Sequence, residues 1–179
     1  EPEAMSSHGR GDSCFAVAVD SRPASTAPTP KVLEPQGPRF LVDAMAGRLG
    51  RWLRLLGYDA RTASDEPDRV LVDLAVAEGR ILVTRDRGLV TELRPDDCVV
   101  LRSERTSDQL RQLFVELGLR RREPSFERCS VCNVEIEPVQ RARIRGRVPE
   151  RIHRRQSIFW RCTSGCRIYW HGSQVARLR

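Results

Sequence analysis

The sequence lacks long hydrophobic runs, is poor in cysteine for its length and contains a single lysine. No apolar stretch approaches the roughly 18 to 20 residues of a membrane-spanning helix, and residues 15–19 are too short for the core of a signal peptide. Six cysteines in 179 residues are too few to build a disulfide-stapled fold. These absences exclude collagens, coiled coils and secreted cystine scaffolds, and they predict a soluble cytoplasmic protein.

Positive charge is concentrated at the C-terminal end of the chain. Residues 120–179 contain 15 arginines and 5 glutamates, whereas residues 40–119 contain 12 arginines and 14 acidic residues. The preference for arginine over lysine is equally consistent with the codon usage of a GC-rich genome. Codon usage does not determine where charge collects, so the C-terminal excess favours a polyanionic partner.

The chain divides into three parts by composition. Residues 1–38 are rich in proline, serine and alanine, so we predict a disordered tail, in which the apolar run 14–19 could add an edge strand. Residues 39–120 alternate short apolar runs with amphipathic periods. Residues 121–179 show no helical periodicity of apolar residues and are richer in arginine. The length suits one domain, here the middle part, followed by a small C-terminal unit.

The middle part is predicted to be an α/β domain with a parallel sheet, because short apolar runs and helical periods alternate along it. Four strands are expected, at residues 40–42, 58–62, 81–84 and 98–101. Three or four helices are expected, and three of them are placed between and after the strands, at residues 45–56, 69–78 and 108–117. Ser107 is the predicted N-cap of the last helix, and Gly118 closes it.

Acidic residues follow three of the predicted strands. Asp43 comes directly after the first strand, Asp86 follows the third, and Asp68 lies with Asp65 and Glu66 beyond the second. Because the carboxyl ends of parallel strands meet at one edge, we expect a cluster that repels itself unless cations neutralise it. Mg²⁺ or Mn²⁺ suits oxygen ligands and promotes phosphodiester hydrolysis, so the pattern predicts a metal-dependent hydrolytic site.

Each of these acidic residues also has a purely structural interpretation. An aspartate between a strand and a helix commonly serves as an N-cap, and this applies to Asp43, Asp68 and Asp86. Asp65 and Glu66 fit equally well on a solvent-exposed loop. Asp43 and Asp86 occupy the same topological position on different strands, which favours the metal-site hypothesis for these two.

Arginines lie close in sequence to the predicted acidic edge. Arg48, Arg51 and Arg54 recur every three residues along the first helix, and Arg85 precedes Asp86. They are interpreted either as solvated surface or as side chains that hold a phosphate backbone by bidentate hydrogen bonds. The candidate nucleic-acid contacts in this domain are Arg48, Arg51 and Arg85.

Four cysteines in the C-terminal unit are spaced as two metal-binding knuckles. Cys129 and Cys132 are separated by two residues, and Cys162 and Cys166 by three. Two turns that each offer a thiolate pair supply the tetrahedral site that Zn²⁺ prefers, against the alternative of unmetallated thiols. Four thiolates leave no open coordination position, so we predict a structural zinc ribbon whose metal supplies folding energy.

The same unit carries features of a nucleic-acid-binding surface. Arginines surround the knuckles, and four aromatic residues lie near the second pair, namely Phe159, Trp160, Tyr169 and Trp170. We expect about half of these rings to fill the ribbon core and the others to be free to stack on unpaired bases. The candidate phosphate contacts are Arg143, Arg145, Arg154 and Arg155.

Several of these segments together resemble one known family. They are residues 40–43 (FLVD), 47–59 (GRLGRWLRLLGYD), 78–86 (EGRILVTRD), 129–133 (CSVCN), 148–149 (VP) and 169–173 (YWHGS). In this order and spacing they are similar to the Mut-seven C-terminal RNase family over residues 39–174. Two positions depart from the family pattern. The second cysteine pair has three intervening residues where two are usual, and Gln174 replaces the usual histidine.

The resemblance implies a fold, a site and an activity. The fold is a PIN-like parallel sheet flanked by helices and followed by a small zinc ribbon, and the activity is that of a metal-dependent ribonuclease. Asp43, Asp68 and Asp86 match the acidic positions of the PIN-like site and are expected to hold Mg²⁺ or Mn²⁺. The expected partner is RNA, single-stranded or structured, with tRNA and rRNA as candidates. A homodimer is left open.

The alternative hypothesis is a non-catalytic RNA- or ribosome-binding protein whose acidic edge is vestigial. It predicts tight, salt-sensitive RNA binding without turnover in any divalent metal. A DNA substrate is also compatible with the charge, because the phosphates of the two nucleic acids look alike at long range.

Overall fold

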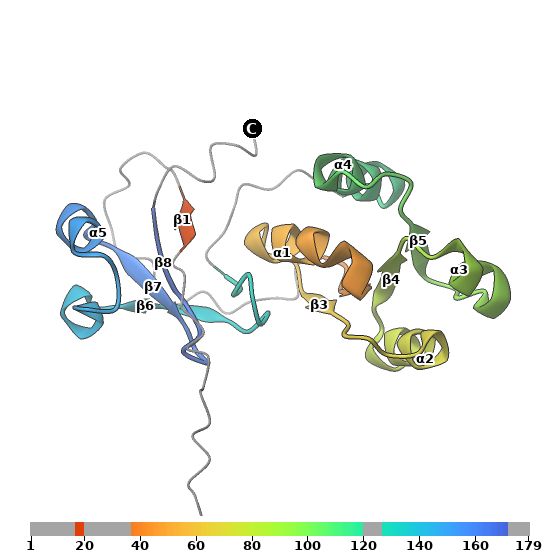
Figure 1. The fold of residues 1–179 in the computed structure, drawn as a ribbon, viewed down its shortest axis with the longest axis horizontal. Coiled ribbons are helices and arrows are strands. Elements are labelled where there is room, and N and C mark those ends of the chain that lie inside the picture. The colour runs from red at the N-terminus through yellow and green to blue at the C-terminus, as the bar shows by residue number, and fades with distance from the viewer. Residues whose placement is uncertain (1–16, 20–36, 120–126, 172–179) are drawn as a thin grey trace, which may run out of the picture.

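The computed structural model describes residues 17–19, 37–119 and 127–171 of the chain. Two four-stranded sheets organise these residues (Figure 1). One sheet is parallel and lies in the middle part of the sequence, and the other is formed mainly by the C-terminal unit. Within the described ranges, no helix is both long enough and apolar enough to cross a membrane.

The first sheet is parallel throughout, as the sequence predicts. Its strands, in spatial order, are β3 (Ala60–Thr62), β2 (Phe40–Val42), β4 (Ile81–Thr84) and β5 (Cys98–Val100). The chain runs from β2 to β3 on one side and then crosses to β4 on the other side of β2. The loops that follow β2 and β4 therefore diverge, which places a topological switch point between these two strands.

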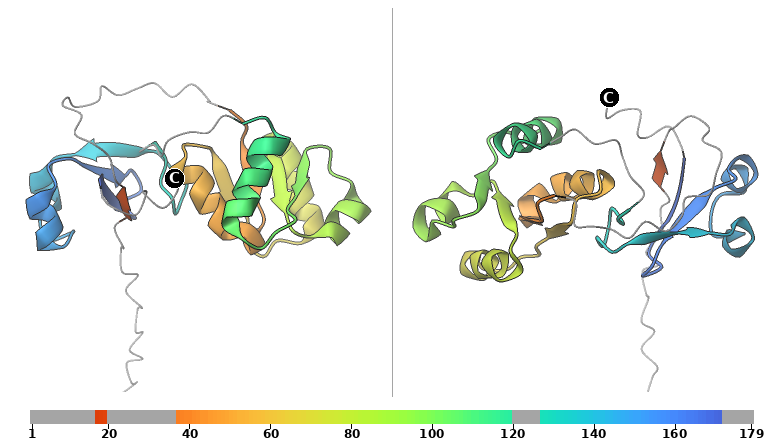
Figure 2. Two further views of the ribbon diagram at one scale, coloured as in Figure 1. Left: turned by 90° about the horizontal axis from the view of Figure 1, so that it is seen from above. Right: turned by 180° about the vertical axis from the view of Figure 1, so that it is seen from behind.

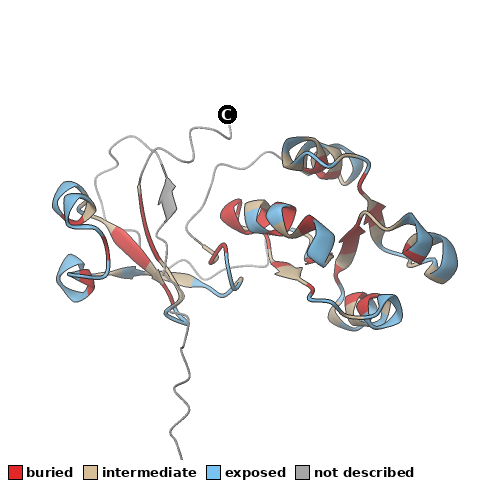
Figure 3. Cartoon of the chain, in the orientation of Figure 1, coloured by how far each residue is buried: buried red, intermediate tan, exposed pale blue. Residues whose placement is uncertain are grey.

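Helices cover both faces of this sheet. They are α1 (Gly47–Leu55), α2 (Asp68–Glu78), α3 (Arg87–Leu93) and α4 (Thr106–Glu116). Alternate side chains of β2 point to opposite faces, so Phe40 and Val42 join the core beneath α1 and α4, whereas Leu41 joins the core beneath α2 and α3. Buried residues alternate with exposed ones along the helices, while the strands are largely buried (Figure 3).

Three local features differ from the sequence prediction. A 3-10 turn, η1 (Ala44–Ala46), precedes α1. The short helix α3 follows β4 directly and is too brief to show a clear apolar period. The last helix begins one residue before Ser107, which is therefore not the N-cap. Instead, the Ser103 hydroxyl accepts a hydrogen bond from the Arg105 N–H at 3.1 Å and donates one to Asp108 at 3.1 Å.

The second sheet forms the C-terminal ribbon. Its strands, in spatial order, are β1 (Val17–Val19), β8 (Ile168–His171), β7 (Phe159–Cys162) and β6 (Ile136–Val139). β6, β7 and β8 are antiparallel neighbours, and β1 is added in parallel to β8. Two short helices without a sequence signal connect β6 to β7, namely η2 (Arg141–Ile144) and α5 (Glu150–Arg155).

β1 lies within the segment 1–38 that the sequence predicts to be a disordered tail. Three residues of its apolar run form the edge strand. Residues 1–16 and 20–36 lie outside the described residues, as do residues 120–126, where the predicted boundary between the two units falls. The predicted departure at Gln174 also lies outside them.

The ribbon lies beside α1 and β3 and away from α3 (Figure 2). Arg54, near the end of α1, donates to the Ser130 carbonyl at 3.0 Å, and Asn133 bonds to Asp59 and Ala60 where β3 begins. These contacts are at the amino end of the parallel sheet. The residues that follow the strands lie at the opposite end, so the ribbon and the predicted acidic edge are separated by the length of the sheet.

Candidate active site and zinc centre

Asp43 and Asp86 lie at the carboxyl ends of the neighbouring strands β2 and β4, and both are half-buried. Asp43 Oδ1 accepts a hydrogen bond from the Met45 N–H at 3.2 Å, and Asp86 Oδ1 accepts one from the Leu89 N–H at 3.1 Å. The N-cap interpretation is therefore correct for both residues. Capping occupies one oxygen of each carboxylate and leaves the other for a different partner.

Thr84 links the two aspartates. This last residue of β4 is fully buried, its hydroxyl donates to Asp43 Oδ2 at 2.6 Å, and it accepts from the Asp86 N–H at 2.9 Å. Within the described part of the chain, Asp86 Oδ2 has no hydrogen-bond partner. A free carboxylate oxygen thus lies near a second, fixed carboxylate at the switch point, where open α/β sheets bind their ligands. In the sequence, the sign of this role is that Thr84 is a polar residue at the end of an otherwise apolar strand.

Asp68 and Glu66 lie beyond β3, at the same edge of the sheet. Asp68 is exposed at the first position of α2, and the N-cap is Pro67, so the N-cap interpretation fails for Asp68. Glu66 Oε1 accepts from the Ser64 hydroxyl at 3.0 Å, whereas Glu66 Oε2 is buried and has no partner among the described atoms. A buried oxygen of this kind is costly unless water or a cation reaches it. Glu66 is therefore a further candidate ligand.

These carboxylates do not form a complete cage for one ion. A cage for one ion needs three or more His, Cys, Asp or Glu side chains whose ligand atoms lie close together. Among the described residues, the four cysteines of the ribbon form such a group, and the carboxylates at this edge do not. Mg²⁺ does not require such a cage, because it commonly keeps several waters and is held by one or two carboxylates together with a substrate phosphate. The oxygen donors at the switch point fit that mode of binding.

The arginines predicted to contact nucleic acid near this edge have different environments. Arg48 and Arg51 on α1 are exposed, whereas Arg54, one turn further on, is 5% exposed. The Arg85 side chain is 29% exposed and forms an ion pair with Glu104. Arg48 and Arg51 are therefore open to a ligand, and Arg54 is not.

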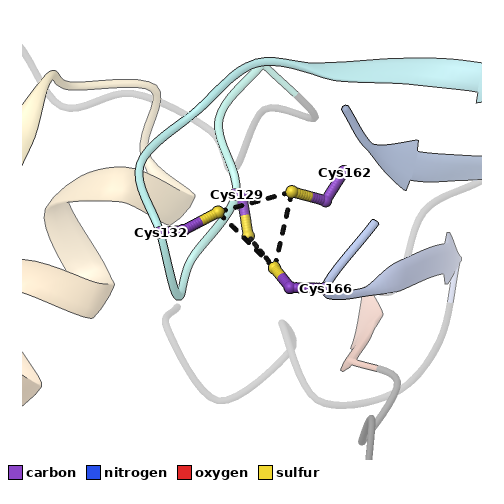
Figure 4. Close-up of side chains that lie close together, drawn as sticks. All are labelled: Cys129, Cys132, Cys162 and Cys166. Atoms are coloured by element: carbon purple, nitrogen blue, oxygen red, sulfur yellow. Dashed lines mark hydrogen bonds between the residues drawn. The ribbon is translucent and has the colours of Figure 1, made fainter. Parts of the chain in front are cut away.

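The four cysteines of the ribbon converge as the sequence predicts (Figure 4). Their Sγ atoms all lie within 4.8 Å of one another. Cys129 and Cys166 are 3.3 Å apart, and Cys132 and Cys162 are 3.4 Å apart. With Zn–S distances of about 2.3 Å, a tetrahedral zinc site has sulfur atoms about 3.8 Å apart. The donor set and its compactness fit Zn²⁺, with no coordination position left for a substrate.

Hydroxyl groups contact the cysteine cluster. The Tyr169 hydroxyl donates to Cys129 Sγ at 3.1 Å and accepts from the Ser130 N–H at 2.9 Å. Burial raises the pKa of Tyr169, which keeps the proton on this hydroxyl. The Ser164 hydroxyl lies 2.9 Å from Cys162 Sγ. Hydrogen bonds of this kind orient metal ligands and tune their basicity.

The four aromatic rings near the second cysteine pair are all buried. Phe159 and Trp170 pack in one ribbon cluster, and Trp160 and Tyr169 pack around the cysteines. None of the four is more than 7% exposed. The expectation that half of these rings are free to stack on bases is therefore wrong. A unit this small needs its large side chains for its own core.

The predicted phosphate contacts of the ribbon are exposed. They are Arg143, Arg145, Arg154 and Arg155. Arg154 forms an ion pair with Glu150 at 3.0 Å, and the other three have no acidic partner within the described residues. η2 and α5, which carry or adjoin all four, lie at the end of the ribbon farthest from the α/β domain (Figure 1).

Asp59 anchors the first knuckle on the sheet. Its carboxylate accepts hydrogen bonds from Arg80 at 2.7 Å and from the Asn133 side-chain amide at 2.7 Å. Burial alone would raise the pKa of Asp59, but the hydrogen bonds from Arg80 and Asn133 lower it to about 2. Asn133 has a φ of 66°, a left-handed conformation that asparagine tolerates, and its Oδ1 accepts from the Ala60 N–H at 3.2 Å.

A protein-family model described as the Mut7-C RNAse domain matches residues 38–179. The match includes both the acidic edge and the cysteine cluster. The chain belongs to the Mut7-C RNAse domain family. No curated protein and no solved structure matches it.

Membership in the Mut7-C family confirms the resemblance seen in the sequence segments. The family description is that of an RNase domain, which suggests a nuclease-like function with RNA as substrate or partner. In this Mut7-C chain, the carboxyl edge of the parallel sheet has the oxygen donors suited to phosphodiester chemistry, and the cysteine cluster could hold a zinc ion.

Proposed function

We propose that this Mut7-C domain is a metal-dependent, PIN-like ribonuclease that hydrolyses RNA phosphodiester bonds at the switch point between β2 and β4. The observation that carries the proposal is the double contact of Thr84, whose hydroxyl joins the Asp43 carboxylate to the Asp86 backbone N–H. Asp86 Oδ2 has no partner among the described residues, because its helix cap uses Oδ1. Asp68, exposed after β3, supplies the third predicted carboxylate from the same edge.

Asp43, Asp68 and Asp86 are the residues that would hold Mg²⁺ or Mn²⁺, and Glu66 offers a further oxygen. When bound, the divalent ion supplies an activated water and neutralises charge that develops on the phosphate. Thr84 and the two helix caps fix Asp43 and Asp86 before substrate arrives. Ligands fixed in advance need little reorganisation during the reaction.

Exposed arginines would hold the RNA along the molecule. α1 begins beside Asp43 and ends at the ribbon, so Arg48 and Arg51 lie between the acidic edge and the ribbon. The exposed arginines of η2 and α5 lie at the far end of the ribbon, where they would contact another part of the RNA (Figure 1).

The ribbon zinc has a structural role in this proposal. Four thiolates saturate the ion, so it contributes folding energy and shapes the RNA-binding surface without entering the reaction. The cytoplasm is the proposed compartment, because its reducing conditions keep such thiols from forming disulfides.

Cleavage of single-stranded and structured RNA by the zinc-loaded chain in Mn²⁺ tests the proposal. We expect Asp43→Asn and Asp86→Asn to lose about 100-fold or more in the cleavage rate, because each removes a negative ligand. Asp73→Asn, an exposed aspartate on α2 that pairs with Arg69, is the matched control and should cleave at the parental rate. Equal rates in the parent and in both site variants would remove the metal-site assignment.

RNA binding without cleavage is a second candidate function. It is favoured by the finding that Asp43 and Asp86 cap helices, because that role requires no metal. It predicts that the zinc-loaded chain binds RNA with an affinity that falls steeply with salt and never cleaves it in Mg²⁺ or Mn²⁺.

A further inference from the structure

Arg54 is a buried arginine at the junction between the α/β domain and the ribbon. It is 5% exposed, and its Nε donates to the Ser130 carbonyl at 3.0 Å. Its Nη1 donates to the Ala60 carbonyl at 2.8 Å and to Thr62 Oγ1 at 2.9 Å. All three acceptors are neutral, and one of them belongs to the residue that directly follows Cys129.

No carboxylate neutralises the charge of Arg54 within salt-bridge distance among the residues that the structure describes. A buried, uncompensated guanidinium is costly, because its charge has left water. Burial lowers the pKa of Arg54, and the negative charge of Cys129 and Cys132 opposes that shift. The nearby negative groups are thus the metal-binding cysteines.

A zinc ion bound by four thiolates carries a net charge of about −2. The thiols of the second knuckle contact other cysteines and the Ser164 hydroxyl. The first knuckle, in contrast, presents its Ser130 carbonyl to Arg54. Arg128 of the ribbon also donates to this knuckle, at the Asn133 carbonyl, but it lies 3.9 Å from the Asp59 carboxylate. Arg54 differs from it in having no carboxylate partner among the described residues.

We propose that Arg54 is the counter-cation of the zinc-loaded cysteine cluster, so that zinc binding to the ribbon and docking of the ribbon on the α/β domain stabilise each other. The inference rests on zinc loading of the cluster and not on the proposed nuclease activity. If zinc favours docking through Arg54, docking favours zinc binding by the same factor, because such coupling is reciprocal. Arg54 is thus a positioning residue that acts on the zinc centre from outside the ribbon.

Zinc affinity of the full chain, measured by competition with a chromophoric chelator, tests this role. We expect Arg54→Met to weaken zinc binding about tenfold or more, in the range known for residues that contact metal ligands. Arg54→Lys retains the charge and should bind zinc more tightly than Arg54→Met. Arg111→Met, which removes an exposed arginine from α4, should leave the affinity unchanged.

Thr62→Val separates charge from packing, because it removes a hydrogen-bond acceptor of Arg54 and keeps the guanidinium in place. We expect its zinc affinity to lie within about threefold of the parent. Equal zinc affinity in the parent and Arg54→Met would overturn the proposal. A loss in Thr62→Val or Arg54→Lys as large as that in Arg54→Met would also overturn it, because the role would then be one of packing alone.

Hydrogen exchange in the unmodified chain provides a test that does not depend on the folding of variants. The Ala60 N–H bonds to Asn133 Oδ1 across the junction, whereas the Leu82 N–H bonds to the Asp97 carbonyl inside the α/β domain. On removal of zinc with a chelator, we expect exchange at Ala60 to accelerate at least tenfold more than exchange at Leu82. Unchanged protection of Ala60 would contradict the coupling.

Discussion

The Thr84 hydroxyl donates a 2.6 Å hydrogen bond to Asp43 Oδ2, and this contact joins the ends of two parallel strands. The same hydroxyl accepts from the Asp86 N–H, so one buried threonine joins the carboxylate of one candidate metal ligand to the backbone of the other. The geometry of the candidate site is therefore fixed by the sheet, because Thr84 is part of β4.

Substitution of Thr84 should reduce activity through the position of the aspartates. Thr84→Val preserves the size of the side chain but leaves Asp43 Oδ2 and the Asp86 N–H without their partner, which costs about 1–3 kcal/mol of stability. We expect RNA cleavage in Mn²⁺ to fall about tenfold at a temperature where the variant is folded. Thr91→Val, on the exposed face of α3, is the control and should match the parent. Full activity in Thr84→Val would show that the bridge is dispensable.

Substitution of Glu66 by glutamine should stabilise the metal-free chain and weaken its binding of Mn²⁺. Glu66→Gln removes the charge of a partly buried carboxylate whose Oε2 has no partner, so the metal-free chain should become about 0.5–1 kcal/mol more stable. The Mn²⁺ concentration for half-maximal cleavage should rise about tenfold, because an oxygen ligand is weakened. Chemical denaturation and a Mn²⁺ titration measure the two effects, and Glu92→Gln on α3 is the control. A change in neither quantity would remove Glu66 from the site.

Two glycines at α1 differ in what an added methyl group would meet. A Cβ at Gly50 would lie 2.7 Å from Thr62 Oγ1, whereas a Cβ at Gly47 would lie 3.7 Å from its nearest neighbour. Gly50→Ala should therefore destabilise the fold by about 1–3 kcal/mol. Gly47→Ala should be neutral or stabilising by up to about 1 kcal/mol, since alanine favours helix. Thermal unfolding of the two zinc-loaded variants measures the difference, and equal stabilities would contradict the packing of α1 on β3.

The ribbon arginines should determine the salt dependence of RNA binding. In a variant with Arg143→Gln and Arg145→Gln, two phosphate contacts are lost, so the slope of log affinity against log salt should become shallower by about 1.4 for single-stranded RNA. Fluorescence anisotropy with a single-stranded RNA of about 24 nucleotides measures this slope. Arg69→Gln on α2 is the control. An unchanged slope would place the RNA elsewhere.

Cys98 should react slowly with alkylating reagents. Burial raises the pKa of this thiol to about 11, two units above the ordinary value of 9.0. At pH 8 its thiolate fraction, and hence its alkylation rate, should be about 100-fold below that of an exposed thiol. The rate should then rise about tenfold per pH unit until the pH approaches 11. Peptide-level mass spectrometry of the native and denatured chain measures these rates. Equally fast reaction in both states would contradict the burial of Cys98.

Local patterns were sufficient to predict the sheet and the cysteine cluster. The strand at 81–84 and the two knuckles are encoded in short stretches of sequence, and both are found where expected. The capping roles of Asp43 and Asp86 are also local, because each caps the turn that follows it. The roles of these aspartates in metal binding are still predictions.

Features that depend on packing between distant segments could not be predicted. Arg54 belongs to a regular arginine stripe, yet it is buried where it bonds to Ser130 of the ribbon. The rings of Trp160 and Tyr169 are drawn into the core by the small size of the ribbon, which composition alone did not reveal. Thr84 is one polar residue at the end of a strand, and its partner Asp43 is 41 positions away in sequence.

The location of Mn²⁺ in a crystal of the zinc-loaded chain, determined from its anomalous scattering, tests the proposed metal site most directly. We predict a manganese peak within about 2.5 Å of Asp86 Oδ2, with Asp43 contributing to the same site. A crystal saturated with Mn²⁺ could instead show no manganese peak at the carboxyl ends of β2 and β4. Asp43 and Asp86 would then act solely as helix caps, and this result would contradict the nuclease assignment.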